Sequence, residues 1–431
     1  MIYIYAMRCF LLLFILQATA CSHTESFPTG KVIDTVVCKA NPSQTYALYI
    51  PPDHKGAVMY CFDAHGAGVL PLNNYKALAD KYGYILVGSN NSKNGNDWST
   101  TETIWQALEK DTRARLEIDT NHVYTLGFSG GAKVAGYVAL NHPGIKSVIV
   151  NGAGLPDGTP PGDFPFTYTT VAGEGDLNLT DLLGYHMALN KTNTKHHLIT
   201  YNGKHEWAPA TSMDVAFAGI KADEGAAPPD FMAKTRTRME MAVQSNQFLK
   251  AETECRLLLS YMPNDNFFKN QLDIILSNPA YKTQSQEQMA VLVKEQNTKE
   301  SYNANLGTQD TAYWPKTISS LNAGAQLPSF EGAMNQRLLA YLSLMFYSVS
   351  NHYMASHTDG VARHFVDLYE LADPTNSEAY YFSAILYARA GDADHAATAL
   401  KNAVKNGFKD KVRFEQQPEF ATMKNLSGIV K

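Results

Sequence analysis

Gly127-Phe128-Ser129-Gly130-Gly131 is the stretch of this sequence that decides the fold. A β-rich segment at 122–126 precedes it, and residues 132–140 follow with apolar side chains at helical spacing. A G-x-S-x-G pattern between a strand and a helix is the context in which a serine stands on a sharp turn with its hydroxyl exposed. Glycines around such a turn let the helix pass close to the strand. The segment predicts that Ser129 is a nucleophile; the alternative is a turn serine that caps the helix.

A nucleophilic serine needs a base and an acid that orients the base. Residues 166–172 predict a buried strand that ends in Gly173-Glu174-Gly175-Asp176, and residues 195–201 predict the next strand, followed by His205. The order serine, acid, histidine is the one expected when a parallel sheet carries all three. We expect Asp176 to be the acid and His205 the base. Glu174 and Asp181 remain alternative acids, and a surface histidine is the alternative for His205.

Backbone amides should stabilise the negative charge that develops on the substrate oxygen. One is the amide of Gly130, which directly follows the serine. A second should come from the loop after the strand candidate at 57–62, where His65-Gly66 can turn a backbone amide inward. We assign that amide to Ala67.

Taken together, residues 28–222 resemble an α/β-hydrolase. The likeness is closest to the branch of secreted esterases and polyhydroxyalkanoate-depolymerase-like enzymes, through His65-Gly66, Gly127-x-Ser129-x-Gly131, Gly173-x-x-Asp176 and His205-x-Trp207. The resemblance implies serine-dependent hydrolysis of an ester, or less often of an amide, without a cofactor or metal. It does not identify the substrate.

Several residues near these motifs are candidate pocket walls, with ordinary packing as the alternative: His65, Asn90, Asn91, Trp98, Phe128 and Trp207. The pair His196-His197 invites a metal interpretation. Neighbouring side chains on a strand point to opposite faces, however, so the two histidines cannot easily share one ion. We expect no metal site.

The length of 431 residues predicts two domains. The chain is 45% hydrophobic, which is enough for a sizeable core. Its net charge is −5 and it has no basic run, so it lacks the electrostatic features of a nucleic-acid-binding protein.

The N-terminus predicts a signal peptide at 1–21. Arg8 precedes a short apolar stretch that ends in Ala18-Thr19-Ala20-Cys21, which resembles a bacterial lipobox. We expect a lipoprotein of the cell envelope, periplasmic or outer-membrane, anchored at Cys21. Ordinary signal cleavage and secretion is the alternative.

Residues 28–222 alternate between strand and helix patterns, which predicts a largely parallel sheet covered on both faces. Residues 31–38 and 44–50 should form a hairpin pair, and Ser99-x-x-Glu102 predicts a capping box that begins a helix. The short, proline-rich interval between the strands ending near Asn151 and starting near Phe166 leaves no room for a helical lid.

A linker is expected at 223–230, and residues 231–431 show helical patterns without strands. Residues 377–390 and 393–405 resemble one tetratricopeptide repeat, in which Tyr380, Ala384 and Tyr387 should interlock with small residues of the second helix. An irregular helical domain is the alternative.

The sequence thus predicts an exported serine hydrolase with an α/β-hydrolase domain and an all-α, tetratricopeptide-like domain. Its expected partners are a small-molecule or polymer ester and, through the C-terminal helices, a second protein. A serine peptidase of the same fold is one alternative. The other is a catalytically silent hydrolase scaffold that acts as an interaction protein.

Overall fold

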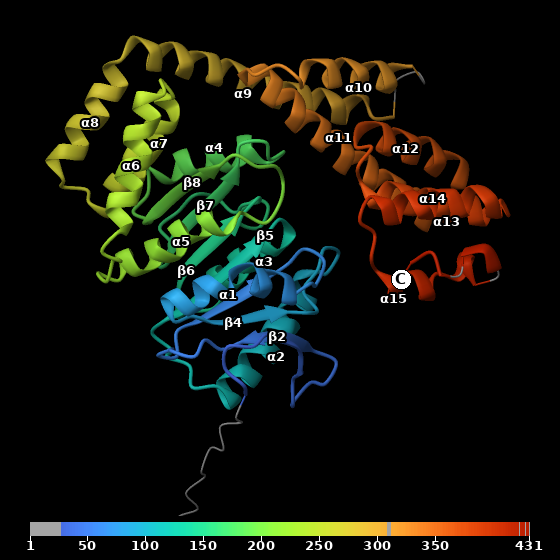
Figure 1. The fold of residues 1–431 in the computed structure, drawn as a ribbon, viewed down its shortest axis with the longest axis horizontal. Coiled ribbons are helices and arrows are strands. Elements are labelled where there is room, and N and C mark those ends of the chain that lie inside the picture. The colour runs from blue at the N-terminus through green and yellow to red at the C-terminus, as the bar shows by residue number, and fades with distance from the viewer. Residues whose placement is uncertain (1–26, 308–311, 422, 427, 431) are drawn as a thin grey trace, which may run out of the picture.

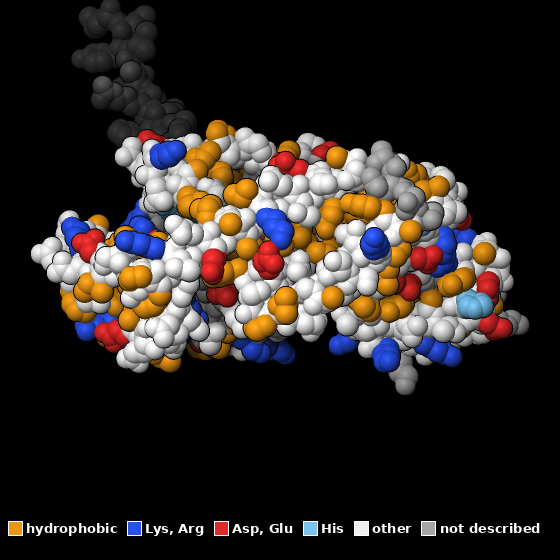
Figure 2. Space-filling view, turned by 90° about the horizontal axis from the view of Figure 1, so that it is seen from above, with side chains coloured by type: hydrophobic (Ala, Val, Ile, Leu, Met, Phe, Trp, Pro, Cys, Tyr) orange, Lys and Arg blue, Asp and Glu red, His pale blue; other side chains and the backbone are white. Residues whose placement is uncertain are grey.

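The structure, a computed structural model, describes residues 27–307, 312–421, 423–426 and 428–430. The expected signal peptide at 1–21, with Cys21, lies outside these residues. Within the described ranges, every helix is too short or too polar to cross a bilayer. Figure 2 shows one face of the molecule, on which acidic, basic and hydrophobic side chains are interspersed.

The first part of the chain forms an eight-stranded sheet in the order β1-β2-β4-β3-β5-β6-β7-β8. The strands are β1 (Ile33–Val37), β2 (Thr45–Tyr49), β3 (Val58–Phe62), β4 (Ile85–Ser89), β5 (Val123–Phe128), β6 (Ile145–Asn151), β7 (Thr167–Gly173) and β8 (His196–Tyr201). β2 pairs antiparallel with β1 and β4, as a hairpin at 31–50 requires, and all other neighbours are parallel. The central strands β3, β4 and β5 are buried along their whole length because both faces of the sheet are covered.

Helices cover both faces of the sheet (Figure 1). They are α1 (Val69–Tyr82), α2 (Trp98–Arg115), α3 (Gly130–Asn141), α4 (Leu179–Leu189) and α5 (Ala210–Asp223). In β3, Val58, Tyr60 and Phe62 pack toward α2 and α3, whereas Met59 and Cys61 pack toward α1 and α5. The predicted α/β-hydrolase architecture is confirmed, and residues 152–166 contain no helix between β6 and β7, as expected.

The rest of the described chain is helical, which confirms the second part of the predicted fold class. The helices are α6 (Phe231–Gln244), α7 (Phe248–Tyr261), α8 (Asn266–Ser277), α9 (Pro279–Asn305), α10 (Tyr313–Gly324), α11 (Phe330–Ala355), α12 (Asp359–Ala372), α13 (Ser377–Arg389), α14 (Ala393–Lys405) and α15 (Lys411–Gln416), followed by two 3₁₀ turns, Pro418–Phe420 and Lys424–Leu426. In Figure 1 they arch from the β8 side of the sheet over its end and away from it.

The first helices of this region complete the cover of the sheet. Phe231 of α6 and Leu257 of α7 belong to the same hydrophobic cluster as α1 and α5. The ring of Tyr261 stacks on that of His197 in β8, with centroids 4.2 Å apart. The core therefore continues across the short connection between α5 and α6, where the linker was expected.

The helices α13 and α14 form the predicted antiparallel pair. Ala384 is buried against small residues of α14 that include Ala396 and Ala403, whereas Tyr380 and Tyr387 are only partly buried. The likeness of this pair to a tetratricopeptide repeat remains a prediction.

One local prediction is wrong. The helix α2 begins at Trp98, and its N-cap is Asp97, whose carboxylate accepts the N–H of Thr100 at 2.7 Å. Ser99 lies inside the first turn and donates its hydroxyl proton to Asp97. An aspartate caps a helix at least as well as a serine and also favours the positive end of the helix dipole, so the helix begins two residues before the expected capping box.

Candidate active site

Ser129 lies on the turn between β5 and α3, with φ 54° and ψ −124°. Such a backbone costs a non-glycine residue about 1–3 kcal/mol, so the surrounding structure must hold it. A Cβ on Gly127 would lie 2.0 Å from the carbonyl oxygen of Gly131, and a Cβ on Gly131 would lie 2.0 Å from that of Phe62. Only glycine fits at both positions. The serine therefore stands on a strained turn at which β3, β5 and α3 converge.

The side chains of Ser129, His205 and Asp176 form one continuous chain of hydrogen bonds. Nε2 of His205 lies 2.9 Å from Oγ of Ser129, and its Nδ1 lies 2.9 and 3.0 Å from the two carboxylate oxygens of Asp176. A carboxylate at Nδ1 fixes the proton there and leaves Nε2 free to accept the serine proton. The three residues come from loops that follow β5, β7 and β8 at the same edge of the sheet.

The loop after β7 turns Asp176, and not its acidic neighbours, toward the histidine. Asp176 is fully buried and also accepts the backbone N–H of Asn178 at 2.8 Å. Asn178 in turn donates its side-chain amide to the carbonyl oxygen of Gly152 at 2.8 Å. Glu174 and Asp181, the alternative acids, are both exposed. The acid position is thus defined by hydrogen bonds on both sides of the carboxylate.

The two expected oxyanion donors differ in their surroundings. Gly130 is the first residue of α3, so its N–H has no acceptor within the helix and lies at the positive end of the helix dipole. The N–H of Ala67 lies 3.4 Å from Oδ1 of Asp63, a long contact that an oxyanion would have to replace. The side chain of Asn94 lies against Gly130, because a Cβ on that glycine would be only 1.8 Å from Oδ1 of Asn94.

Asp63 joins the loop after β3 to the loop that carries His205. Its carboxylate, 2% exposed, accepts the backbone N–H of His65 at 2.8 Å and Nε1–H of Trp207 at 2.8 Å. Burial raises the pKa of Asp63, but the contacts with His65 and Trp207 outweigh it and hold the pKa below 3.8. Asp63 therefore stays ionised at neutral pH and holds the two loops together.

Asn151, at the end of β6, forms hydrogen bonds to three segments around the site: the turn at Ser129, the end of β7 and Ala208, which follows the His205 loop. It is fully buried; its carbonyl oxygen accepts the N–H of Ser129 at 2.9 Å, and its side chain bonds the carbonyl oxygen of Val171 and the N–H of Ala208. Neither Asn151 nor Asp63 was predicted from the sequence to be a site residue. A polar residue at the carboxyl end of an apolar parallel strand is the signal that would have identified them.

Of the expected pocket residues, Phe128 contacts the loop that carries both His205 and Trp207. The ring of Phe128 lies 4.8 Å from the ring of His205 and 5.5 Å from that of Trp207, centroid to centroid. These aromatic rings restrict how the imidazole can turn. Trp98, by contrast, stacks on Tyr137 on the outer face of α2 and α3, 4.8 Å apart, and is 44% exposed.

The remaining expected pocket residues lie elsewhere. Asn90 donates its side-chain amide to the carbonyl oxygen of Asp34, and Asn91 accepts the N–H of Thr45, so both serve the edge of the sheet near β1 and β2. The side chain of His65 is 83% exposed. The ordinary packing alternative fits the two asparagines better than a pocket wall.

The two adjacent histidines of β8 face opposite sides of the sheet. His196 rests against His186 of α4, with centroids 4.7 Å apart. His197 lies 3.0 Å from Asp223 and 2.7 Å from Ser260 on the other side. Burial lowers the pKa of His197, although Asp223 opposes the shift.

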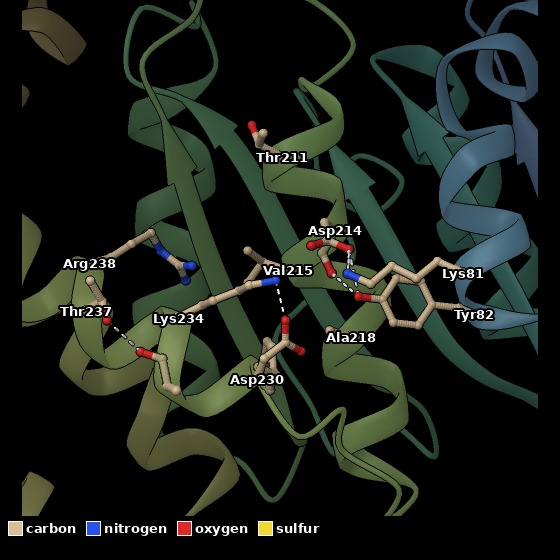
Figure 3. A pocket seen from close by; sticks show the side chains of 12 residues that line it. Lys81, Tyr82, Thr211, Asp214, Val215, Ala218, Asp230, Lys234, Thr237 and Arg238 are labelled. Atoms are coloured by element: carbon tan, nitrogen blue, oxygen red, sulfur yellow. Dashed lines mark hydrogen bonds and ion pairs between the residues drawn. The ribbon is translucent and has the colours of Figure 1, made fainter.

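Two cavities lie near the sheet. The walls of one, of about 260 Å³, include Lys133 of α3 and Asn178, whose N–H bonds Asp176. A larger cavity of about 520 Å³ lies among α1, α5 and α6 (Figure 3). Its charged walls are satisfied internally, as in the contact of 2.6 Å between Lys81 and Asp214. Ser129, His205 and Asp176 line neither of the two cavities.

Neither a protein-family model nor a curated protein sequence matches this chain. Similar solved structures include an esterase of the archaeon Pyrobaculum calidifontis (12% identity, TM-score 0.37), the fluorophosphonate-binding serine hydrolase F of Staphylococcus aureus (11%, 0.38) and the carboxylesterase EstE1 cloned from a metagenomic library (13%, 0.39). The matches cover 47, 45 and 48% of this chain and 88, 99 and 92% of those structures. Identities this low concern the fold alone.

Proposed function

We propose that this protein is a serine hydrolase that cleaves a carboxylic ester, with Ser129 as nucleophile, His205 as general base and Asp176 as the orienting acid. The observation that carries the proposal is the unbroken hydrogen-bond path from Oγ of Ser129 through the imidazole to a fully buried carboxylate. The strained backbone at Ser129 supports it further, because such strain persists where a side chain must be held in one orientation.

In the acylation step, Oγ of Ser129 attacks the carbonyl carbon while Nε2 of His205 takes its proton. The carbonyl oxygen becomes an oxyanion, which the amides of Gly130 and Ala67 stabilise by about 3–4 kcal/mol per donor. The tetrahedral intermediate then collapses: the ester C–O bond breaks, and the imidazolium gives its proton to the departing alcohol. Asp176 stabilises the imidazolium throughout.

In the deacylation step, water takes the place of the alcohol. His205 accepts a proton from the water as its oxygen attacks the acyl carbon, and returns that proton to Oγ of Ser129 as the acyl–serine bond breaks. The products are a carboxylic acid and the free enzyme. His205 must be neutral to begin each step, because only then can Nε2 accept a proton.

The proposed substrate is a carboxylic ester. The cavity of about 260 Å³ beside Asn178 is smaller than most ligand pockets and is not lined by Ser129, so it sets no limit on the acyl group. The absence of a helix within 152–166 leaves this side of the site open, which suits a small or a polymeric ester.

A fluorophosphonate probe tests the proposal directly. The wild-type protein should be labelled at Ser129, and Ser129→Ala should lose the label while keeping the same unfolding midpoint. Hydrolysis of p-nitrophenyl esters of increasing acyl length, compared with peptide anilides, then separates an esterase from a peptidase. A wild-type protein that is neither labelled nor active on any of these substrates would be a silent scaffold, and the proposal would fail.

Export to the cell envelope through a lipid on Cys21 is a separate proposal, based on the sequence of residues 1–21. Metabolic labelling with a palmitate analogue should mark the wild-type protein and not Cys21→Ser. A role of the C-terminal helices in binding a second protein is likewise a proposal, for which the paired helices α13 and α14 are the candidate region.

A further inference from the structure

Two buried cations of the helical region reach the loop that carries Asp176. Arg337 of α11 donates Nη1–H to the carbonyl oxygen of Glu174 at 2.9 Å, and Nζ of Lys299 in α9 donates to the carbonyl oxygen of Leu177 at 2.7 Å. These carbonyls stand two residues before and one residue after Asp176. Figure 1 shows α9 running past the α4 side of the sheet, where this loop lies.

One carboxylate holds both cations in place. Glu295 lies 2.6 Å from Nη2 of Arg337 through one oxygen and 2.9 Å from Nζ of Lys299 through the other. Its side chain is fully buried, and those of Arg337 and Lys299 are 5 and 7% exposed. We call Glu295, Lys299 and Arg337 the brace.

A buried group of two cations and one anion is costly unless every remaining N–H finds an acceptor. Oε2 of Glu295 accepts two N–H groups of Arg337, whereas Oε1 faces Nζ of Lys299 without accepting a hydrogen bond. The carbonyl oxygens of Glu174 and Leu177 therefore supply each cation with an acceptor that the carboxylate does not. Hydrogen bonds from charged donors are roughly twice as strong as neutral ones. The brace is therefore bound to this loop by its own electrostatics, and the loop cannot move without leaving buried charge unsatisfied.

The sheet holds the opposite side of the same loop. The N–H of Glu174 donates to the carbonyl oxygen of Tyr201 at 2.8 Å, and that of Gly175 donates to Gly203 at 2.8 Å. The loop is thus clamped between the end of β8, which leads to His205, and the brace. Asp176 lies between the clamped positions.

We propose that Arg337 and Lys299 are positioning residues that hold Asp176 in register with His205, so that the helical region is part of the catalytic apparatus and not an appended module. This inference rests on the proposed function, because it gives Asp176 its catalytic meaning. Neither residue touches the substrate or the reacting atoms; both act through the backbone of the acid loop.

The test compares Arg337→Met, Lys299→Met and Arg337→Lys in the full-length protein. If the brace positions Asp176, each Met variant lowers kcat about 10- to 100-fold with KM nearly unchanged, because a displacement of about 1 Å is enough for such a loss. Arg337→Lys keeps the charge and one donor and should recover part of the rate. Each Met variant leaves the other cation facing Glu295, so the remaining buried charges stay paired, and an unchanged unfolding midpoint guards against simple failure to fold.

Arg389→Gln is the matched control. Arg389 also forms ion pairs within the helical region, partly buried ones with Asp359 and Glu419 at 2.8 Å each, but its partners are all in that region. The variant Arg389→Gln should lower the unfolding midpoint while leaving kcat unchanged. An equal loss of kcat in Arg389→Gln and Arg337→Met would show that any damage to the helical region suffices, and would overturn the inference.

A second arm uses Asp176→Asn as background. Loss of the acid should cost about 10⁴-fold in kcat. If Arg337 acts only through Asp176, adding Arg337→Met to this variant lowers kcat no further; independent, multiplicative losses would refute the positioning role.

Hydrogen exchange of the backbone amides in 173–183 separates failure of the brace from failure of the proposed function, because it needs no activity. Arg337→Met and Lys299→Met should exchange faster there than the wild type and Arg389→Gln. Unchanged exchange together with unchanged kcat would refute the brace while leaving the triad intact. If these variants exchange faster but the fluorophosphonate probe never labels the wild-type protein, the brace holds the loop but neither Arg337 nor Lys299 has a role in catalysis.

Discussion

Replacement of Gly131 by alanine should damage the site severely. The added Cβ would lie 2.0 Å from the carbonyl oxygen and 2.5 Å from the carbonyl carbon of Phe62, and both are backbone atoms that cannot rotate away. To reach 3.0 Å, below which real Cβ contacts are essentially never found, the start of α3 must move at least about 1 Å away from β3. Ser129 directly precedes this helix and would move with it.

The expected result of Gly131→Ala is a loss of about 100-fold in kcat, because the serine and His205 no longer meet at hydrogen-bond distance. The free energy of unfolding should fall by about 1–3 kcal/mol, the usual range for overpacking. Initial rates with a p-nitrophenyl ester and urea unfolding followed by fluorescence measure the two effects separately.

Gly184→Ala is the matched control. Gly184 lies inside α4, and a Cβ there would meet nothing within 4 Å. Alanine is a better helix former than glycine, so this variant should gain about 0.5–1 kcal/mol of stability and keep its activity. If Gly131→Ala behaved like Gly184→Ala in both assays, the tight junction between β3 and α3 would not exist, and the geometry argued for Ser129 would be refuted.

Further predictions concern acid, the Asp63 contact and the helical region. Burial lowers the pKa of His186 to about 3, so between about pH 6.5 and 3 only the unfolded chain binds a proton there, and stability falls on acidification. Between about pH 7 and pH 5 the melting temperature of His186→Gln should therefore fall less than that of the wild type. An equal fall would contradict this. Trp207→Phe leaves the buried carboxylate of Asp63 without one donor, so urea unfolding at neutral pH should show a free energy of unfolding lower by about 1–3 kcal/mol. This difference should diminish as Asp63 is protonated near and below its usual pKa of 3.8. A difference that is independent of pH would argue against a role of the carboxylate. Truncation after residue 225 uncovers β8 and the buried side chain of His197, so the product should be less stable than the full chain by at least about 3 kcal/mol or aggregate; a truncated protein with an unchanged midpoint and full activity would disprove both this cover and the brace.

Local sequence patterns accounted for the sheet and for the three central residues. The strand at 122–126, the glycines and the helix at 132–140 predicted the turn at Ser129. A strained turn and a helix packed close to a strand require glycines, and hydrophobic periodicity identifies the strand and the helix on either side. The positions of Asp176 and His205 followed from a general rule, since the carboxyl ends of parallel strands meet at one edge.

The sequence was ambiguous about the start of α2 and about the partners of Asn90 and Asn91. The start of α2 was placed at Ser99 because Ser-x-x-Glu is a common capping pattern, whereas Asp97 competed for the same role with a stronger acceptor. Asn90 and Asn91 were candidate pocket walls, yet their side-chain amides bond the neighbouring edge of the sheet. Which of several adjacent polar groups finds which partner depends on distances that no pattern contains.

The sequence by itself determined the parallel sheet, the turn at Ser129 and the placing of Asp176 and His205 after neighbouring strands, because each depends on residues that are close together in the chain. Only the tertiary structure decided that Asp63 meets Trp207 across 144 residues and that Arg337 meets Glu174 across 163. Charged side chains on a helix look the same in sequence whether they face water or a distant loop. Their burial and their partners are set by how the helices pack, and that is decided by the whole core at once.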